Sequence, residues 1–310
     1  MRRRSTAGLV LLAALSAVAP HPAAAQQKPL TRTFAAGAEE RYQVSISIRV
    51  ETHGITTERI GEKTYANNFT HEANGQISWR SIRGISSVAS DGTAALTETM
   101  DRFQASCDGD PAARTFDSAL QKSVQAMCAT LQNSAEFNYQ EEKFGHIRGL
   151  PESEGNLTGS DSSLLSLWAR RAFRPSVIFP KTPLHFGDRA AHRIENFSPD
   201  HGKPEGEESM EWLEVSGEIP VAMLHVSQNL SWIDSAGKNL ATNIATRRGP
   251  RHLFYADSLN TVSMLDGSLL KASRSATHET KDTLEPVPGL PDAPVFGSKL
   301  TFTVTMLRLP

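Results

Sequence analysis

Three histidines lie among acidic residues in the segment LHFGDRAAHRIENFSPDH, at His185, His192 and His201. Histidine and carboxylate groups bind transition metals at about 2 Å, usually from spacings such as His-x3-His on a helix or His-x-His on a strand. These histidines are seven and nine residues apart, a spacing that does not by itself bring them together. We interpret them as solvated or locally hydrogen-bonded side chains, and we predict no metal site and no cofactor.

Motifs for catalysis are scarce. The sequence has no Gly-x-Ser-x-Gly elbow, no His-Glu-x-x-His pair, no Walker loop and no Gly-x-Gly-x-x-Gly fingerprint. The adjacent pairs Glu141-Glu142 and Glu207-Glu208 are poor acid/base partners, because neighbouring residues on a strand point to opposite faces. The sequence therefore identifies no catalytic residue.

The N-terminus has the pattern of a secretory signal peptide. Three arginines at Arg2–Arg4 precede an apolar run from Ala7 to Ala19, and the small residues at 23–25 provide a cleavage site. The run is shorter than the ~20 residues that a bilayer span needs, and no later apolar segment approaches that length. We predict cleavage after Ala25, a periplasmic or secreted location, and no transmembrane segment in the mature chain.

The charge balance argues against a nucleic-acid partner. The chain of 310 residues has 32 basic and 34 acidic residues, and its net charge is −2. Phosphate binding needs a concentrated basic face, and beyond the leader only the short cluster at Arg247, Arg248 and Arg251 approaches one. We interpret that cluster as a solvated loop beside Gly249 and Pro250. The sequence does not indicate the oligomeric state.

Period-two alternation of apolar and polar residues predicts strands near both ends of the chain. Tyr42–Glu51 and Lys299–Leu309 alternate most strictly. Asn74-Gly75, Asp91-Gly92 and Asp266-Gly267 are dipeptides typical of hairpin turns. We therefore predict a mainly β (α+β) fold, a curved antiparallel sheet or incomplete barrel with one or two covering helices. Three further segments are weaker strand candidates: Thr93–Phe103, Val221–Trp232 and Ser268–Glu279.

Two helices are predicted in the middle of the chain. Asp110 can cap a helix that begins at Pro111, whose apolar face recurs every three or four residues. A second helix follows Ser160 or Asp161. The polar stretch PESEGNLTGSDS between them is the best candidate for a boundary. The domains are then a signal peptide at 1–25, a β segment plus helix at 26–150, and a helix plus β segment at 160–310, with one continuous domain as the alternative. The apolar face of the first helix is formed by Phe116, Leu120, Val124, Cys128 and Leu131.

The only two cysteines, Cys107 and Cys128, are predicted to form a disulfide. Export places them in an oxidising compartment, where an even number of cysteines usually means pairing. A helix from Pro111 would rise about 26 Å before Cys128, so the bond can form only if the strand that ends at Cys107 runs back alongside the helix or the helix is broken. A break near Ala113–Phe116, with Thr115 as a second cap, would shorten this rise to about 18 Å.

A resemblance to a class of exported bacterial proteins concerns the second half of the chain. Phe179-Pro180 and Pro183 lead into a Gly-Asp turn at Phe186–Asp188, and LLKASRSATHE follows Asp266-Gly267. This order resembles exported proteins of unknown function whose sheets are similar to the incomplete barrels of LolA-type lipoprotein carriers. Arg189 and Ala190 stand where such proteins often have an aromatic residue. The resemblance implies a curved-sheet architecture and an apolar ligand.

Three function classes follow from these patterns. The favoured one is an exported protein that binds a lipid or another apolar or amphipathic small molecule in a cavity between a curved sheet and the first helix. The alternatives are a structural or protein-interaction module of the envelope and an unrecognised hydrolase. The candidate cavity residues are Phe116, Leu120, Val124, Leu131, Ile46 and Ile48.

Overall fold

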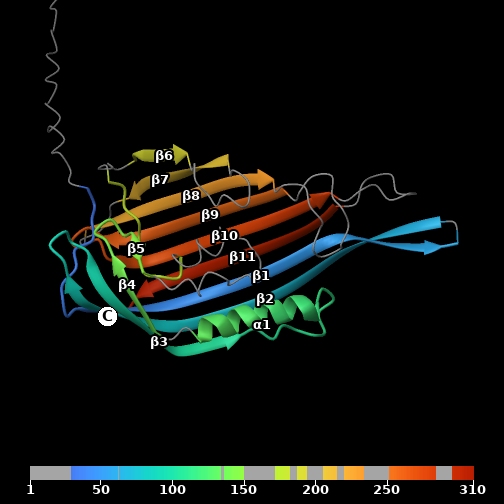
Figure 1. Ribbon diagram of the computed structural model, residues 1–310, viewed down its shortest axis with the longest axis horizontal. Coiled ribbons are helices and arrows are strands. Elements are labelled where there is room, and N and C mark those ends of the chain that lie inside the picture. The colour runs from blue at the N-terminus through green and yellow to red at the C-terminus, as the bar shows by residue number, and fades with distance from the viewer. Residues whose placement is uncertain are drawn as a thin grey trace, which may run out of the picture.

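One large antiparallel sheet organises the molecule (Figure 1). The computed structural model describes residues 29–61, 63–133, 136–149, 172–181, 187–193, 205–214, 220–233, 251–283 and 295–310. Within these ranges eleven strands follow the order β5-β4-β3-β2-β1-β11-β10-β9-β8-β7-β6, and each neighbouring pair is antiparallel. The sheet is open and curved, with β5 and β6 at its two edges.

The strands have the following bounds: β1 Glu39–Ile60, β2 Lys63–Val88, β3 Ala94–Ser106, β4 Glu136–Glu141, β5 Ile147–Arg148, β6 Arg189–Arg193, β7 Glu205–Glu214, β8 Val221–Ile233, β9 Arg251–Ser263, β10 Leu269–Thr283 and β11 Val295–Arg308. One helix, α1 at Ser118–Gln132, lies among the described residues. The prediction of a mainly β fold with a curved antiparallel sheet is confirmed. The second predicted helix falls outside the described residues.

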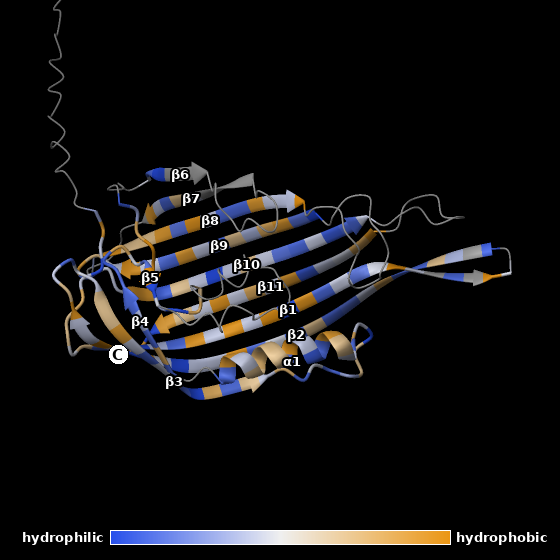
Figure 2. Ribbon diagram, in the orientation of Figure 1, coloured by the Kyte–Doolittle hydropathy of each residue, from blue (hydrophilic) through white to orange (hydrophobic). Residues whose placement is uncertain are grey.

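Alternation gives the sheet two different faces, and Figure 2 shows it as changing colours along the strands. On β1, Tyr42, Val44, Ile46 and Ile48 are buried, whereas the residues between them are more exposed. We call the face that carries the even-numbered residues of β1 and β11 the inner face. The same pattern on β11 buries Phe302, Val304 and Met306. The two strictly alternating segments therefore form adjacent central strands, paired through Ile46 and Val304.

The expected turn at Asn74-Gly75 is wrong, because β2 continues through it from Lys63 to Val88. Gly75 pairs with Ile48 and faces α1. A side chain there would lie 2.7 Å from Val124 Cγ1, so the glycine provides room for the helix and does not form a turn. The chain reverses at Gly61 instead, with φ +64°. Turns do form at Asp91-Gly92 and Asp266-Gly267, as predicted.

The first helix begins later than predicted. Asp110 accepts a hydrogen bond from the Ala112 N–H in a local turn, and the chain does not continue from it into a helix. The N-cap is Asp117, whose carboxylate accepts from the N–H groups of Ala119 and Leu120. Asp110 and Asp117 offer the same capping chemistry. The prediction of a start at Pro111 is therefore wrong, and Thr115 is not a cap.

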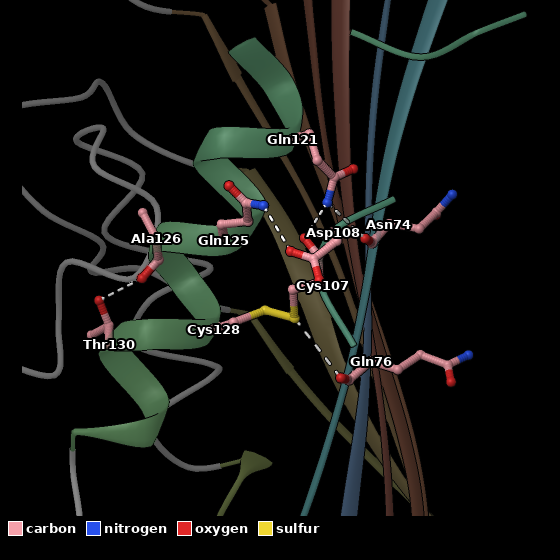
Figure 3. The surroundings of a disulfide bond; sticks show 9 residues. All are labelled: Asn74, Gln76, Cys107, Asp108, Gln121, Gln125, Ala126, Cys128 and Thr130. Atoms are coloured by element: carbon pink, nitrogen blue, oxygen red, sulfur yellow. Dashed lines mark hydrogen bonds between the residues drawn. A yellow bond between two sulfur atoms is a disulfide. The ribbon is translucent and has the colours of Figure 1, made fainter. Parts of the chain in front are cut away.

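The later start removes the geometric difficulty of the disulfide, which joins Cys107 to Cys128 (Figure 3). Cys107 directly follows β3, and Cys128 is on the buried side of α1. Gln121 supports the same junction, since its Nε2 donates to the backbone oxygens of Asn74 and Cys107. The predicted pairing is confirmed, and it fixes the helix to the inner face.

Replacing Gly75 by alanine should lower the free energy of unfolding by about 1–3 kcal/mol, because the new Cβ would overlap Val124 and lie 3.1 Å from Cys107 Sγ. Urea denaturation measures the change. Gly84→Ala is the matched control on β2, since the nearest atom there is 3.9 Å away. Adding Val124→Ala removes the overlapping atom, so the double variant should lose less than the sum of the single variants. Simple additivity would contradict this packing.

Strands from both predicted halves of the chain share the sheet, because β11 pairs with β1 on one side and with β10 on the other. No helix in the described part of the chain is both long and apolar enough to cross a membrane.

Candidate functional site

The predicted cavity residues form a packed core. Ile46, Ile48, Val124 and Leu131 are all buried in one apolar cluster, and Leu120 packs against it half-buried. Phe116 lies before α1 and forms an isolated bridge with Glu72 of β2. The helix and the sheet therefore touch through their own side chains here.

A segment that we call the strap, Ala172–Lys181, also packs on the inner face. Phe173 meets Phe302 of β11 edge to face, with ring centroids 5.8 Å apart. Arg274 of β10 donates to the backbone oxygens of Ala172, Arg174 and Ser176 over 2.7–3.0 Å. Arg83 of β2 donates to the Pro175 oxygen over 2.8 Å. Two buried arginines from opposite halves of the sheet therefore hold the strap.

Arg83 is the centre of a buried network of charged groups. It is fully buried and contacts the carboxylates of Glu40 and Glu141 and the hydroxyl of Tyr139. Glu98, also fully buried, accepts from Ser81 and Tyr139. Because these groups are closed off from solvent and bonded to one another, we assign the network to the stability of the fold.

The pKa values in this network follow from burial and from the neighbouring charges. Burial alone would raise the pKa of Glu40, but Arg83 and Arg32 outweigh it and lower that pKa below its usual range. Burial raises the pKa of Tyr139 well above its usual range. Burial also lowers the pKa of Arg274 to about 10. At neutral pH the carboxylate and the arginines therefore keep their charges.

Toward the other end of the strands, β8, β9 and β10 bring three aromatic rings together on the inner face. The rings of His252 and Trp232 are nearly parallel, with centroids 4.8 Å apart, and His278 lies 5.5 Å from Trp232. His252 Nδ1 and His278 Nε2 are 3.0 Å apart, so one nitrogen donates to the other. Thr280 Oγ1 lies 3.3 Å from the same His252 nitrogen. The three rings are nearly parallel and stacked, Trp232 and His278 are buried, and hydrogen-bonding groups lie at the ring edges.

A second ring cluster lies across the sheet on β2 and β11. Phe69 contacts Phe296 edge to face at 5.4 Å and His71 at 5.0 Å. Both phenylalanines lie over Gly54 of β1, where an added Cβ would come within 2.8–2.9 Å of them. His71 Nδ1 is a buried nitrogen that has no hydrogen-bond partner in the described structure.

Small and half-buried side chains form the floor between the two ring clusters. The register places His71, Thr52, Ser298, Thr280, His252 and Trp232 in one row across six adjacent strands. Val50 and Leu300 are a pair in the next row, toward the core. Ser298 is exposed, although residues nearer the core on the same face of β11 are buried. We call the two ring clusters and this floor the ring-flanked site.

This arrangement suits a ligand with both apolar and polar parts. Aromatic rings bind flat or apolar groups through their faces. Hydroxyl and imidazole groups beside them provide hydrogen bonds that give a ligand its orientation.

No local pattern in the sequence predicts this site. Alternation at most places His278 on the same strand face as Arg274 and Ala276. Of the three histidines that the sequence brought forward, His185 and His201 lie outside the described residues, and His192 is on β6 opposite Glu208. No group of three or more potential metal ligands occurs within the described ranges. The prediction that no metal binds stays a prediction.

Comparisons with known proteins do not assign a family. No family model and no curated protein matches the chain. Among solved structures, the type II secretion system secretin GspD of E. coli K12 is 9% identical, over 88% of this chain and 50% of that chain, with a TM-score of 0.18. The InvG secretin domain β-barrel from the Salmonella SPI-1 injectisome is 11% identical, over 87% and 61%, with a TM-score of 0.14. The chain thus spans about half the length of the first secretin chain. Similarities this low carry no functional argument, and the LolA-type resemblance stays a prediction.

Proposed function

We propose that this protein is an exported binding protein that holds an amphipathic small molecule, such as a lipid, at the ring-flanked site. The observation that carries the proposal is the exposed floor at Ser298 between two aromatic clusters, on a face that is elsewhere packed. In this proposal the open sheet acts as an incomplete barrel whose inner face is closed by α1 and the strap near the core and accessible at the other end.

The two ends of such a ligand would contact different groups. Its apolar part would lie along Val50 and Leu300 and between the rings. Its polar part would bond to the imidazoles of His252 and His278 and to the hydroxyls of Thr280 and Ser298. The disulfide and the signal-peptide pattern support a location outside the cytoplasm, since disulfides persist in oxidising compartments.

Native mass spectrometry of protein purified from its own cell envelope tests the proposal first. We expect an adduct that organic solvent extracts and that a fluorescent fatty acid can replace in the protein. If the protein carries no adduct and does not bind the fluorescent fatty acid, the proposal is wrong, and an envelope interaction module becomes the better description.

His252→Ala should weaken binding of the fluorescent fatty acid roughly tenfold, because it removes a stacking partner and a hydrogen-bonding group. His225→Ala is the matched control. His225 is on the adjacent strand β8 but on the outer face, where it bonds to Asp257 at 2.5 Å. Titration followed by fluorescence gives both dissociation constants. Equal losses in the two variants would place the ligand away from the ring-flanked site.

A further inference from the structure

Strands β1 and β2 continue well beyond the rest of the sheet as a two-stranded ribbon, which projects clearly from the molecule (Figure 1). The last β1 residue paired with β11 is His53, and β3 pairs with β2 only from Gln76 onward. We call residues 54–60 and 63–69 the arm. Its seven residue pairs, from Gly54–Phe69 to Ile60–Lys63, extend about 23 Å. No other described strand pairs with the arm.

Two large apolar side chains are exposed toward the tip of the arm, on a face that also carries the polar residues Thr56, Glu58, Lys63 and Asn67. The register places Ile60, Tyr65 and Phe69 on the same face, the one continuous with the inner face of the sheet. Ile60 is 60% exposed and Tyr65 is 47% exposed, whereas Phe69 is half-buried in the ring cluster. Ile60 and Tyr65 therefore give the tip of the arm two exposed apolar groups, which the polar pair Thr56–Asn67 separates from Phe69.

Isolated two-stranded ribbons are only marginally stable in water, and exposed Ile and Tyr at the tip of one add nothing to the fold. Two such side chains offer far less than the roughly 800 Å² that each partner buries in a stable protein interface. Shallow insertion into a lipid surface needs only a few apolar groups. Tyrosine favours the boundary between lipid and water. The exposed Lys63 pairs with Ile60 at the tip and suits anionic headgroups, whereas the exposed Glu58 pairs with Tyr65 two residues further from the tip.

We propose that the tip of the arm inserts into the interfacial region of an anionic lipid membrane. Ile60 and Tyr65 enter the level of the headgroups and upper acyl chains, and Lys63 contacts the phosphates. The unpaired backbone edges of the arm stay where water can bond to them, because in the hydrocarbon core they would cost several kcal/mol each. Lipid binding by the arm does not rest on the proposed function.

Flotation with vesicles of equal parts phosphatidylethanolamine and phosphatidylglycerol tests this inference, with protein purified from the cell envelope. The wild type should float with the vesicles, and the double variant Ile60→Ser, Tyr65→Ser should lose at least about tenfold in partitioning. Leu265→Ser is the control, because Leu265 is 76% exposed in the turn between β9 and β10. That control should change partitioning less than twofold, and both variants should keep the melting temperature of the wild type.

Three results would overturn the inference: a wild type that does not float, a Leu265→Ser variant that loses as much as the arm variant, or an arm variant that sediments without lipid as a smaller species than the wild type. The last result would make the arm a contact between two copies of the chain. Binding of the fluorescent fatty acid in solution separates the two proposals. The arm variant should keep it and His252→Ala should lose it, whatever the vesicle result.

Discussion

Replacing Arg83 by methionine is expected to lower the free energy of unfolding by about 3–5 kcal/mol, the usual cost of removing one partner from a buried charge network. Arg83 is fully buried and bridges Glu40, Glu141, Tyr139 and the backbone oxygen of Pro175. Methionine fills a similar volume but removes the counter-charge of the buried Glu141 carboxylate, one of the two arginines that bond to Glu40, and the donor to the Pro175 oxygen. Equilibrium denaturation in urea measures the loss.

Arg80→Met is the matched control for this experiment. Arg80 is on the same strand and pairs with Asp101, but both side chains are partly exposed, so its loss should cost no more than about 1 kcal/mol. Combining Arg83→Met with Glu141→Gln removes the charge that the first change left buried, and it should recover part of the stability. Equal destabilisation by Arg83→Met and Arg80→Met would show that the network is not the support we describe.

Removing the disulfide by Cys107→Ser and Cys128→Ser is expected to cost about 3 kcal/mol. The bond closes a loop with a sequence separation of 21 and thereby restricts the unfolded chain. It also fixes α1 to β2 beside Gly75, so the helix should lose protection from hydrogen exchange before the central strands do. Thermal or urea unfolding, followed by hydrogen exchange of the two forms, measures both effects.

The chain contains only these two cysteines, so a reductant acts on this bond alone, and reduced wild-type protein should match the double serine variant. Thiol labelling of denatured, unreduced protein should find no reactive cysteine. Two labelled cysteines per chain, or an unchanged unfolding midpoint after reduction, would count against the stabilising role of the bond.

Local patterns in the sequence were enough for β1, β3, β8, β10 and β11 and for the disulfide. Period-two alternation is a property of the chain itself, so it identified the segments that became β1 and β11. The cysteine count and the expected export were enough to predict the Cys107–Cys128 pair. The start of α1 was missed because Asp110 and Asp117 carry the same capping signal, and only the packing of the helix on β2 selects between them.

Asn74-Gly75 shows how tertiary structure can override a local signal. The dipeptide favours a hairpin turn, but its glycine is in the middle of β2 because Val124 and the disulfide approach the backbone there. Local sequence patterns cannot define the ring-flanked site. Its row runs from His71 to Trp232 across six strands, and it exists because β11 pairs with both β1 and β10.

The sequence by itself determined that this chain forms alternating strands with one apolar face and that its two cysteines pair, since both depend on residue types and spacing along the chain. Only the tertiary structure decided which strands are neighbours and in what register. Pairing between the two ends of the chain depends on burying a whole face of the sheet at once. It therefore cannot be predicted from any short segment of the sequence. Those pairings place Trp232, His252 and His278 opposite Phe69 and Phe296, and so create the candidate site.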